Sequence, residues 1–427
     1  MTQHRRSRVA RAGLVAFATA GALVLAGCSG SGSGGSGTSG SQSFSLSYAV
    51  TNSAVTAPYK ALAEAYMKEN PGVKITYNEV PNDTYGQTLT TQLNAGNSSD
   101  VFQAAPGEGQ TYSILTLAKA GLLMPLSDSA TKVIPEGSDS QFIVDGKTYG
   151  SALGMTFVGA VSNDTASKAA DTEYPKTWDD LISTCKDLKS KGKSLYALAG
   201  AAPPNTGLLA LSISATRVYA DNPEWNKDRS DGKTTFAGTA GWKDTLNDIV
   251  DMNKAGCFQP GVEGGGFDAI TQGIIQGTSL AAFIPSGAAA DLKQNAKDQD
   301  FLIQPIPPAS GGKAFGIAGA DYAISIAKNT KNADAAKKFV EWTATEKGQS
   351  TFAKAGGGMP PTTSDFAGTP FEPVSEIVKD KSYVPLPNSS WPNSNVYDAL
   401  GSGVQGLLTG QKTVDDVLKS MDAAWGN

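Results

Sequence analysis

The order of apolar and polar positions predicts that the first part of the chain alternates between strands and helices. Period-two alternation marks a half-buried strand, and a 3.6-residue period marks an amphipathic helix. The pattern is strand, helix, strand, helix and strand over residues 44–50, 58–70, 73–77, 84–95 and 100–103. Strands that alternate with helices are typical of a parallel sheet covered by helices, so this part predicts an α/β fold.

The rest of the chain continues this alternation after a mostly apolar run, residues 153–162, that is long enough to cross from one lobe to another. Thr177 and Asp180, three residues apart, are typical of a helix start and predict a helix that ends near Gly192. Residues 201–207 are interpreted as a loop after a strand. Further strands are expected at 195–199, 279–284 and 315–326, and further helices at 241–255, 267–276, 333–346 and 414–425.

The first 27 residues have the pattern of a signal peptide and are expected to take no part in the fold. Four arginines precede an uncharged run, residues 12–26, that is shorter than the roughly 20 residues needed to span a bilayer. The sequence Leu25-Ala26-Gly27-Cys28 resembles the bacterial lipobox, so we expect cleavage before Cys28 and lipidation of its thiol, with palmitate as the acyl group. Residues 29–41, rich in Gly and Ser, predict a flexible tether. A secretory signal with a chance cysteine is the alternative.

The charge and the histidine content exclude several classes of function. The chain has 35 Lys and Arg against 40 Asp and Glu, and 31 against 40 remain without the four arginines of the signal, a formal charge of −9. An acidic body lacks the basic surface that nucleic acid binding requires. The one histidine is His4, so the body has no imidazole for Ser-His-Asp or Cys-His catalysis or for most zinc sites. We expect no nucleic acid, metal or cofactor.

Cys185 and Cys257 are the cysteines that remain after Cys28. Two thiols outside the cytoplasm favour a disulfide, and two separate buried thiols are the alternative. The sequence contains no second long apolar run, so the body is expected to be soluble and to meet the membrane through its lipid alone.

Six short segments occur in an order that carries a family resemblance: Asn70-Pro71-Gly72 before a strand, Asp145–Tyr149 before the crossing, Pro175–Leu181, Gln272–Phe283, Asn329–Thr343 and Leu407–Val417. Together they resemble the extracellular solute-binding proteins of family 1, relatives of maltose-binding protein that deliver sugars to ABC importers. The chain departs from that pattern twice. It lacks the Tyr of a Tyr-Asn pair before Asn163, and Pro285-Ser286-Gly287 stands where the family often has a sugar-stacking Trp.

This resemblance implies an α/β, two-lobed periplasmic-binding-protein-like fold with a hinge between the lobes and a ligand cleft between them. The lobes would be joined by two or three crossings. The implied division is a signal peptide at 1–27, the lipidated Cys and tether at 28–43, lobe 1 at 44–155 plus 318–364, and lobe 2 at 156–317 plus 365–427. Cys185 and Cys257 then fall in the same lobe, which suits a structural disulfide.

Ligands of open α/β sheets bind beyond the carboxyl ends of the strands, so the loops after the strands are expected to carry the site. A sugar needs aromatic faces for its rings and polar side chains for its hydroxyls. Trp391 is the preferred aromatic by analogy with the family, with burial in the core as the alternative. The candidate ligand-binding residues are Asn52, Ser53, Gln103, Glu108, Met155, Thr156, Phe157, Asn205, Thr206, Ser286, Asp321, Tyr322, Gly357, Trp391 and Asn393.

The resemblance implies a monomeric, non-enzymatic substrate-binding lipoprotein on the extracytoplasmic face of the cell membrane. It would capture a small carbohydrate, an oligosaccharide, and deliver it to the transmembrane subunits of an ABC permease. Two alternatives stay open. One is a binding protein for a peptide, polyamine or anion. The other is a secreted glycoside hydrolase, because paired carboxylates such as Asp100, Glu108 and Asp321 need no histidine.

Overall fold

The computed structural model describes residues 43–50, 58–108, 110–356, 358–361 and 366–426. The expected signal peptide and the lipidation site Cys28 lie outside these residues, as do the candidate ligand-binding residues Asn52, Ser53 and Gly357. Within the described part, no helix combines the length and the apolar character needed to cross a membrane.

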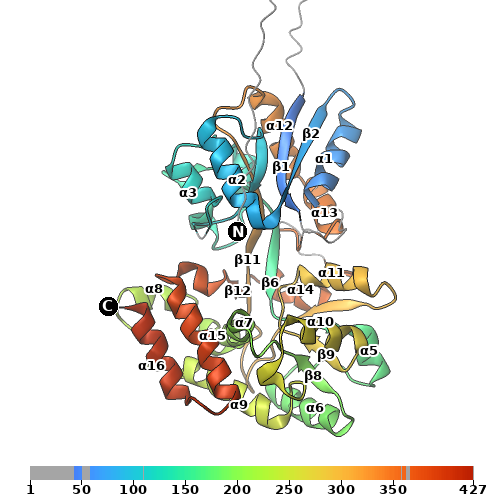
Figure 1. Ribbon diagram of the computed structural model, residues 1–427, viewed down its shortest axis with the longest axis vertical. Coiled ribbons are helices and arrows are strands. Elements are labelled where there is room, and N and C mark those ends of the chain that lie inside the picture. Colours follow the sequence, from blue (N-terminus) through green and yellow to red (C-terminus); the bar gives the residue numbers. More distant parts are fainter. Residues whose placement is uncertain (1–42, 51–57, 109, 357, 362–365, 427) are drawn as a thin grey trace, which may run out of the picture. The chain divides into compact units, whose positions relative to one another are not determined.

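The main sheet of the first lobe has neighbouring strands in the order β12-β11-β3-β1-β2, with β6 also paired to β11, and it extends into the second lobe, where β12 pairs with the start of β11 (Figure 1). The pairs β1–β2 and β1–β3 are parallel, whereas β11 is antiparallel to β3 and β6. The strands are β1 (Ser43–Val50), β2 (Lys74–Pro81), β3 (Val101–Ala104), β6 (Ser151–Val158), β11 (Gly316–Ile326) and β12 (Tyr383–Val384).

Helices cover both faces of this sheet because side chains of each strand point alternately to opposite faces. Ile324 and Ile326 of β11 pack with α1 (Pro58–Glu69), α12 (Ala333–Thr343) and α13 (Glu346–Lys354). Ala323 and Ala327 belong to the cluster on the other face, with α2 (Asn82–Ala95) and α3 (Ile114–Lys119). The smaller elements of this lobe are α4 (Asp128–Lys132), the 3₁₀ turn η1 (Asp139–Gln141) and the hairpin β4 (Ile143–Val144) and β5 (Lys147–Thr148).

The second lobe contains a four-stranded sheet in the order β10-β7-β9-β8. β8 and β9 are parallel, and β7 is antiparallel to both β9 and β10. The strands are β7 (Ala160–Asn163), β8 (Ser194–Ala197), β9 (Ser279–Ala282) and β10 (Phe301–Gln304).

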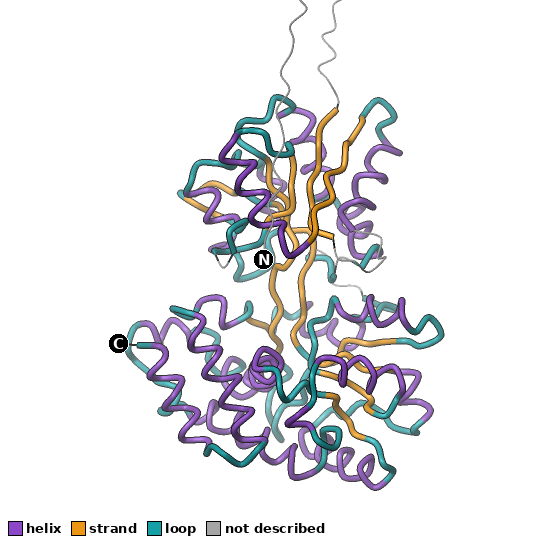
Figure 2. Tube along the Cα trace, in the orientation of Figure 1, coloured by secondary structure: helices purple, strands orange, loops and turns teal. Residues whose placement is uncertain are grey.

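The helices of the second lobe also divide between the two faces of its sheet, as the traces in Figures 1 and 2 show. One face packs on α6 (Trp178–Ser190), α7 (Pro203–Ser214), α9 (Ala240–Ala255), α15 (Ser394–Leu408) and α16 (Val414–Trp425). The other packs on α10 (Phe267–Gln276), α11 (Ala288–Asn295) and α14 (Ser375–Lys379). The remaining elements are α5 (Asp164–Ala169), α8 (Trp225–Ser230), the π-helical turn η2 (Ala215–Tyr219) and the 3₁₀ turns η3 (Val262–Gly264), η4 (Glu372–Val374) and η5 (Pro387–Ser390).

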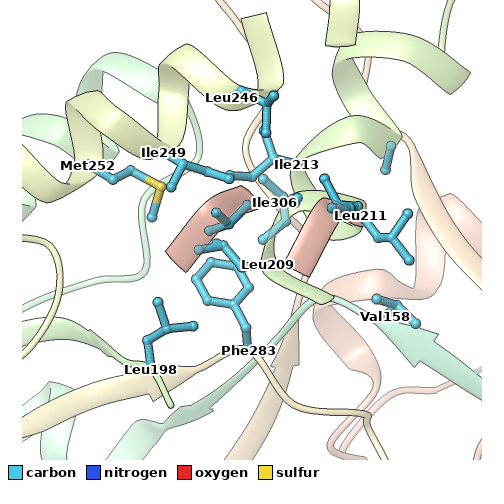
Figure 3. Packing of buried hydrophobic residues seen from close by; sticks show 14 of the residues in the cluster. Val158, Leu198, Leu209, Leu211, Ile213, Leu246, Ile249, Met252, Phe283 and Ile306 are labelled. Atoms are coloured by element: carbon cyan, nitrogen blue, oxygen red, sulfur yellow. The ribbon is translucent and has the colours of Figure 1, made fainter. Parts of the chain in front are cut away.

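The larger core of this lobe is aliphatic where α7 crosses α9. Leu209 and Ile213 from α7 lie among Leu246, Ile249 and Met252 from α9, with Phe283 beside them (Figure 3). These apolar positions recur every three or four residues along each helix, which puts them on one helix face. The helices expected at 241–255 and 267–276 are confirmed as α9 and α10.

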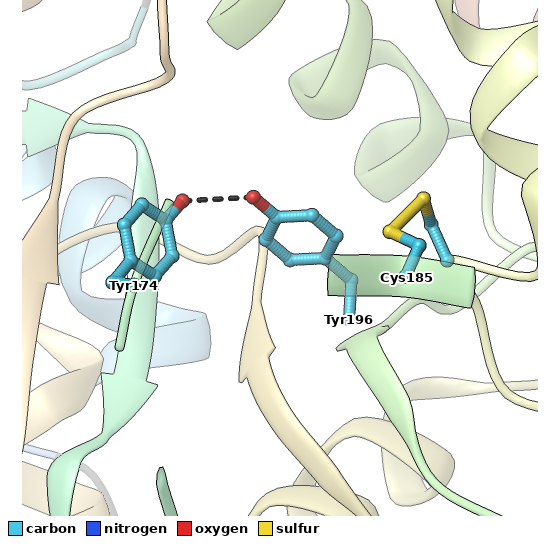
Figure 4. The surroundings of a disulfide bond; sticks show 4 residues. Tyr174, Cys185 and Tyr196 are labelled. Atoms are coloured by element: carbon cyan, nitrogen blue, oxygen red, sulfur yellow. Dashed lines mark hydrogen bonds between the residues drawn. A yellow bond between two sulfur atoms is a disulfide. The ribbon is translucent and has the colours of Figure 1, made fainter. Parts of the chain in front are cut away.

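The structure joins Cys185 and Cys257 by a disulfide with an S–S distance of 2.07 Å, as the sequence predicted. Cys185 lies on α6, and Cys257 follows α9 beside β8, where its carbonyl accepts the backbone N–H of Tyr196 at 2.8 Å. The Tyr196 hydroxyl forms a 2.8 Å hydrogen bond with that of Tyr174 (Figure 4). The bridge therefore ties two helices to the central sheet.

The predicted crossing at 153–162 consists of two strands that belong to different sheets. β6 pairs with β11 in the first sheet, and β7, after Gly159, pairs with β9 and β10 in the second. The chain returns from β10 to β11, which forms a second connection.

The segment 201–207 is not the loop that the sequence predicted. α7 begins at Pro203, and Pro203 and Pro204 occupy its first turn. Proline is tolerated there because the first N–H groups of a helix have no intrahelical acceptor and the ring already has helical φ. Two adjacent prolines favour a loop interpretation from sequence alone, but at this position they begin a helix.

Asp100, immediately before β3, has both carboxylate oxygens occupied by protein donors. Oδ2 accepts the backbone N–H of Ser45 at 2.7 Å and its hydroxyl at 2.8 Å, and Oδ1 accepts the hydroxyl of Thr330 at 2.5 Å. Burial alone would raise the pKa of Asp100, but the hydrogen bonds from Thr330 and Ser45 outweigh it and lower the pKa below its ordinary value. Asp100 is thus an ionised anchor between β1, β3 and the end of β11.

Candidate functional site

The ends of strands from both sheets converge on β6 and β11. Ala104 at the carboxyl end of β3 pairs with Ala323 of β11. In the loop after β9, the Ser286 hydroxyl accepts the backbone N–H of Phe157 at 3.0 Å, and the Ser286 N–H donates to the Phe157 carbonyl at 3.2 Å. Loops that follow strands of both lobes are thus held beside the same pair of connecting strands, where an α/β ligand site is expected.

Asp321 is the extra residue of a β-bulge at this point. Ala320 pairs with Met155, and Tyr322 with the adjacent Gly154, so Asp321 has no partner on β6. A bulge redirects the side chain that it carries, and bulges are frequent beside functional sites. The hydroxyl of Thr156 donates to Asp321 Oδ2 at 2.5 Å, which fixes the carboxylate while leaving other lone pairs free.

The Asp321 carboxylate is exposed to solvent yet surrounded by protein groups, which is what a concave surface produces. The surrounding protein raises the pKa of Asp321 above its ordinary value, although the hydrogen bond from Thr156 opposes that shift. Burial, reinforced by the charge of Asp321 and then of Asp291, raises the pKa of Tyr322 to about 12. Burial and the Asp321 charge also raise the pKa of Tyr112. The site therefore combines a carboxylate acceptor with neutral phenol groups.

A cavity of about 700 Å³ lies beside this point, between α11, α13 and described residues of the following segments, 358–360 and 366–371. Ala290 and Ala353 contribute to its mainly apolar wall, and Phe366 and Phe371 supply aromatic surface. Ser286 lines the cavity, and so do the neighbours of Gly357 on either side. This volume lies within the range of small-molecule sites.

The backbone conformation and surroundings of residue 358 require a glycine. Its φ is +85°, and a Cβ atom there would lie 2.8 Å from the Met155 carbonyl oxygen. The close approach allows Met155 and Met359 to exchange backbone hydrogen bonds of 2.7 and 3.0 Å. The segment therefore lies against β6 as a further strand-like connection.

Met155 and Phe157, two candidates on β6, are buried rather than open to a ligand. Met155 is 1 % exposed, and the Phe157 side chain is equally buried in the core that contains α10 and α11. Their backbone atoms hold Met359 and Ser286, so both residues shape the site without offering a side chain to it.

Asn205 and Thr206 are also structural, because α7 carries them into the interior. Asn205 Oδ1 accepts the Ala199 N–H at 2.9 Å, and its Nδ2 donates to the Phe283 carbonyl at 2.7 Å, which ties the ends of β8 and β9. The buried Thr206 hydroxyl donates to the carbonyl of Gly401 at 2.8 Å. Asn205 and Thr206 were predicted as ligand-binding residues because residues 201–207 were interpreted as a loop.

Trp391, the aromatic that the sequence analysis preferred, lies in the core. It is 7 % exposed, and its ring centroid is 5.6 Å from that of Phe236 and 6.2 Å from that of Trp242. Its indole N–H donates to Asn226 Oδ1 at 3.3 Å. The ring is thus enclosed by other aromatic side chains, and the core alternative is the one that the structure favours.

The other three candidates have protein partners of their own. Gln103 Oε1 accepts the backbone N–H of Ala49 at 2.9 Å, at the end of β1. Glu108 is exposed and forms an ion pair with Lys119. Asn393 is the N-cap of α15, where its Oδ1 accepts the Asn395 N–H at 3.0 Å. Of the described candidates, Thr156, Asp321 and Tyr322 are brought together at the connecting strands, and Ser286, which is 2 % exposed, lies against them through its bonds to Phe157.

Two further tyrosines were not singled out from the sequence, and one of them, Tyr112, lies close enough to Asp321 for burial and that carboxylate together to raise its pKa. Tyr112 follows β3 and packs edge-on against Tyr85 with ring centroids 5.2 Å apart. Tyr397, half-buried on α15, donates its hydroxyl to the Pro204 carbonyl at 2.7 Å, at the start of α7. The rule that sites follow strands could have identified Tyr112. Nothing local indicates Tyr397, because α7 and α15 meet only in the folded chain.

The arrangement does not support hydrolysis by Asp100 and Asp321 as a carboxylate pair. Ala327 donates its N–H to the Asp100 carbonyl, six residues from Asp321 along β11, so the two acids are about 20 Å apart at strand spacing. Glycosidases need a separation of about 5–9.5 Å. Within the described ranges, no group of three or more His, Cys, Asp or Glu could hold a metal ion.

Two α/β lobes, connecting strands between them and a polar site at the ends of their sheets define a solute-binding protein of the two-lobed periplasmic type. The chain belongs to the bacterial extracellular solute-binding protein family, whose pattern matches residues 51–350. Members of this family bind solutes and are not enzymes, which agrees with the prediction from the sequence.

Relatives with names that state a ligand are similar over most of their length. A multiple sugar-binding protein of Streptococcus mutans is 23 % identical over 351 residues, 80 % of this chain and 81 % of the relative. A maltooligosaccharide ABC transporter solute-binding lipoprotein of Streptococcus pneumoniae is 27 % identical over 377 residues, with coverages of 82 % and 81 %. Among solved structures, the apo-form of RafE from Streptococcus pneumoniae superposes with a TM-score of 0.71 at 20 % identity, over 90 % of this chain and 98 % of that one.

Proposed function

We propose that this protein captures a small carbohydrate, most simply an oligosaccharide, between its two lobes and delivers it to the transmembrane subunits of an ABC importer. The carrying observation is the Asp321 bulge, where Thr156 fixes a solvent-accessible carboxylate beside Tyr112 and Tyr322. A carboxylate with free lone pairs accepts hydrogen bonds from sugar hydroxyls, and phenol rings offer faces to sugar rings. The sugar ligands named for two relatives support the same solute class.

The proposal includes the expected attachment and architecture. Lipid on Cys28 and a tether through residue 43 would hold the protein as a monomer at the extracytoplasmic face of the membrane. Lobe 1 would comprise 44–155 with 318–364, and lobe 2 the rest of the body. The proposed ligand contacts are Thr156, Ser286, Asp321 and Tyr322, with Tyr112 and Tyr397 added.

A thermal-shift panel tests the solute class. A ligand that binds the folded state alone raises the apparent stability by about 2.7 kcal/mol at a hundred times its Kd, so the melting temperature rises with ligand concentration. The panel contains mono- and oligosaccharides, amino acids, peptides, polyamines and inorganic anions. We expect a shift with an oligosaccharide. A shift with another class and with no sugar would contradict the proposal, and release of reducing ends would support the hydrolase alternative.

The role of Asp321 gives a sharper prediction. Asp321→Ala is expected to weaken the binding of that oligosaccharide by roughly 10- to 100-fold, because hydrogen bonds to a charged group are each worth about 1.5–3 kcal/mol. Asp321→Asn keeps one acceptor oxygen, so its affinity should lie between those of Asp321→Ala and the wild type. Isothermal titration calorimetry measures the three affinities.

Asp321 should not be needed for folding. Its pKa is raised in the folded state, so its ionised form opposes folding, and this cost appears as the pH rises through the folded pKa. Asp321→Asn should therefore keep or raise the melting temperature at pH 7. The matched control is Asp251→Asn, which replaces an exposed carboxylate on α9. It should change neither the melting temperature nor the affinity for the ligand. Unchanged affinity in Asp321→Ala would remove Asp321 from the site.

A further inference from the structure

Phe267, the first residue of α10, is the one large apolar side chain in the described part of the chain that is prominently exposed, at 56 %. Ile270 and Ile274 follow three and seven residues later, which places all three on one face of the helix. Both isoleucines are buried against the second sheet, among Ala197, Ala199 and Ala282. Phe267 therefore lies on the same helix face as the two buried isoleucines, one turn before Ile270, but the sheet does not cover it.

This turn of α10 lies at the edge of the sheet where the proposed site is. α10 leads into β9 through the short connection Gly277–Thr278 and packs on it, so the helix runs antiparallel to β9 and starts at its carboxyl end. The Gly265 carbonyl, two residues before Phe267, accepts the N–H of Ala201, which follows β8, at 3.0 Å. The start of α10 is thus held against the loop that follows β8, and the direction of the helix places Phe267 toward the carboxyl end of β9.

Those loops offer little surface of their own to an apolar ligand face. After β8 and the buried Leu198 and Ala199, the loop continues as Gly200-Ala201-Ala202, and the turn after β9 is Pro285-Ser286-Gly287. Gly264, three residues before Phe267, has no heavy atom within 4 Å of the position that a Cβ would take, so the surface at that residue is open. A phenyl ring among small side chains and beside polar groups matches the requirement of a pyranose, which has both an apolar face and a hydroxyl rim.

Single exposed apolar residues are common on protein surfaces and by themselves indicate nothing. The location of Phe267 distinguishes it from such residues, because its ring lies at the carboxyl ends of the strands and on the helix face that is turned toward the sheet. We propose that Phe267 provides the face against which one sugar ring of the ligand packs, opposite the hydroxyl-binding groups around Asp321. This inference rests on the proposed function, and it assigns an aromatic contact from the second lobe.

Calorimetry on three variants of the full protein tests it, with the oligosaccharide that gives the largest thermal shift as the probe. Phe267→Ala should weaken binding by at least tenfold, and Phe267→Leu should lose several-fold because it keeps apolar area without a flat face. Phe267→Tyr should stay within threefold of wild type. All three should melt within about a degree of the ligand-free wild type, because the ring is outside the core.

A direct readout is the fluorescence of Phe267→Trp, whose exposed indole should shift to shorter wavelength when the sugar binds. Wild-type affinity in Phe267→Ala, or no spectral shift in a Phe267→Trp variant that binds, would overturn the inference and leave the sugar proposal intact. Normal affinity together with impaired import in cells would assign the ring to the transporter subunits and would also overturn it. Absence of any sugar shift in the wild type would overturn both.

Discussion

Replacing Trp391 by alanine is expected to lower the free energy of unfolding by about 3–5 kcal/mol, the range found for large-to-small substitutions of buried aromatic residues. The ring fills a space among Phe236, Trp242 and Trp425 near α15 and α16. Its removal leaves a cavity that the surrounding rings can fill only in part. It also removes the indole N–H that donates to Asn226 Oδ1, which keeps the Tyr219 hydroxyl as a donor. Chemical denaturation monitored by circular dichroism measures the loss.

The same variant should still bind the ligand. Measured well below the melting temperature, its affinity is expected to stay within about threefold of wild type, because Trp391 presents almost no surface to solvent. Trp391→Phe, which keeps an apolar ring, should recover part of the stability. Phe267→Ala is the matched opposite case, with lower affinity and unchanged stability. A Trp391→Ala protein that keeps its stability and loses its ligand would show that the core assignment is wrong.

Removing the disulfide is expected to produce the second large loss, about 2–5 kcal/mol of unfolding free energy. The bridge connects residues 72 apart in the sequence, so it restricts a long loop of the unfolded chain. The double substitution Cys185→Ala and Cys257→Ala avoids leaving a free thiol or a new buried hydroxyl. Thermal and denaturant unfolding of the oxidised wild type and the double variant measure the difference.

Reduction of the wild type provides the control for this prediction. If the covalent bond is what stabilises the fold, the reduced wild type and the double variant should melt at similar temperatures. A reductant should not change the double variant, which has no bridge to lose. Equal stability of the oxidised wild type and the double variant would mean that α6, α9 and β8 hold together without the bond.

Local chemistry allowed much of the fold to be predicted. The alternation at 44–50 became β1, the strand expected at 279–284 became β9, and the helices expected at 241–255 and 414–425 became α9 and α16. Thr177 begins α6, and its hydroxyl accepts the N–H of Asp180 at 3.2 Å. These features depend on neighbours within a few residues, so the sequence contains them directly. The pair Cys185 and Cys257 also followed from sequence, since few cysteines remained to choose from.

The predicted roles of single residues were less reliable where they depended on whether the side chain faces the solvent or another element. Asn205 looked like a loop residue after a strand, but the prolines before it begin α7 and turn its amide into the interior. Trp391 looked like a ligand-facing aromatic, but it lies in a cluster of rings from segments more than 100 residues apart in sequence. Periodicity gives the face of a helix and does not give the partner that covers it.

The sequence by itself determined the class of this protein: an acidic, histidine-free α/β body with a disulfide, in a family that binds solutes outside the cytoplasm. Only the tertiary structure decided which polar and aromatic groups meet. Asp321 is redirected by a bulge that exists only when β11 pairs with β6, and Phe267 stays 56 % exposed although Ile270, three residues later on α10, is buried. Composition and local pattern are properties of a segment, whereas strand register and burial depend on residues far away in the sequence.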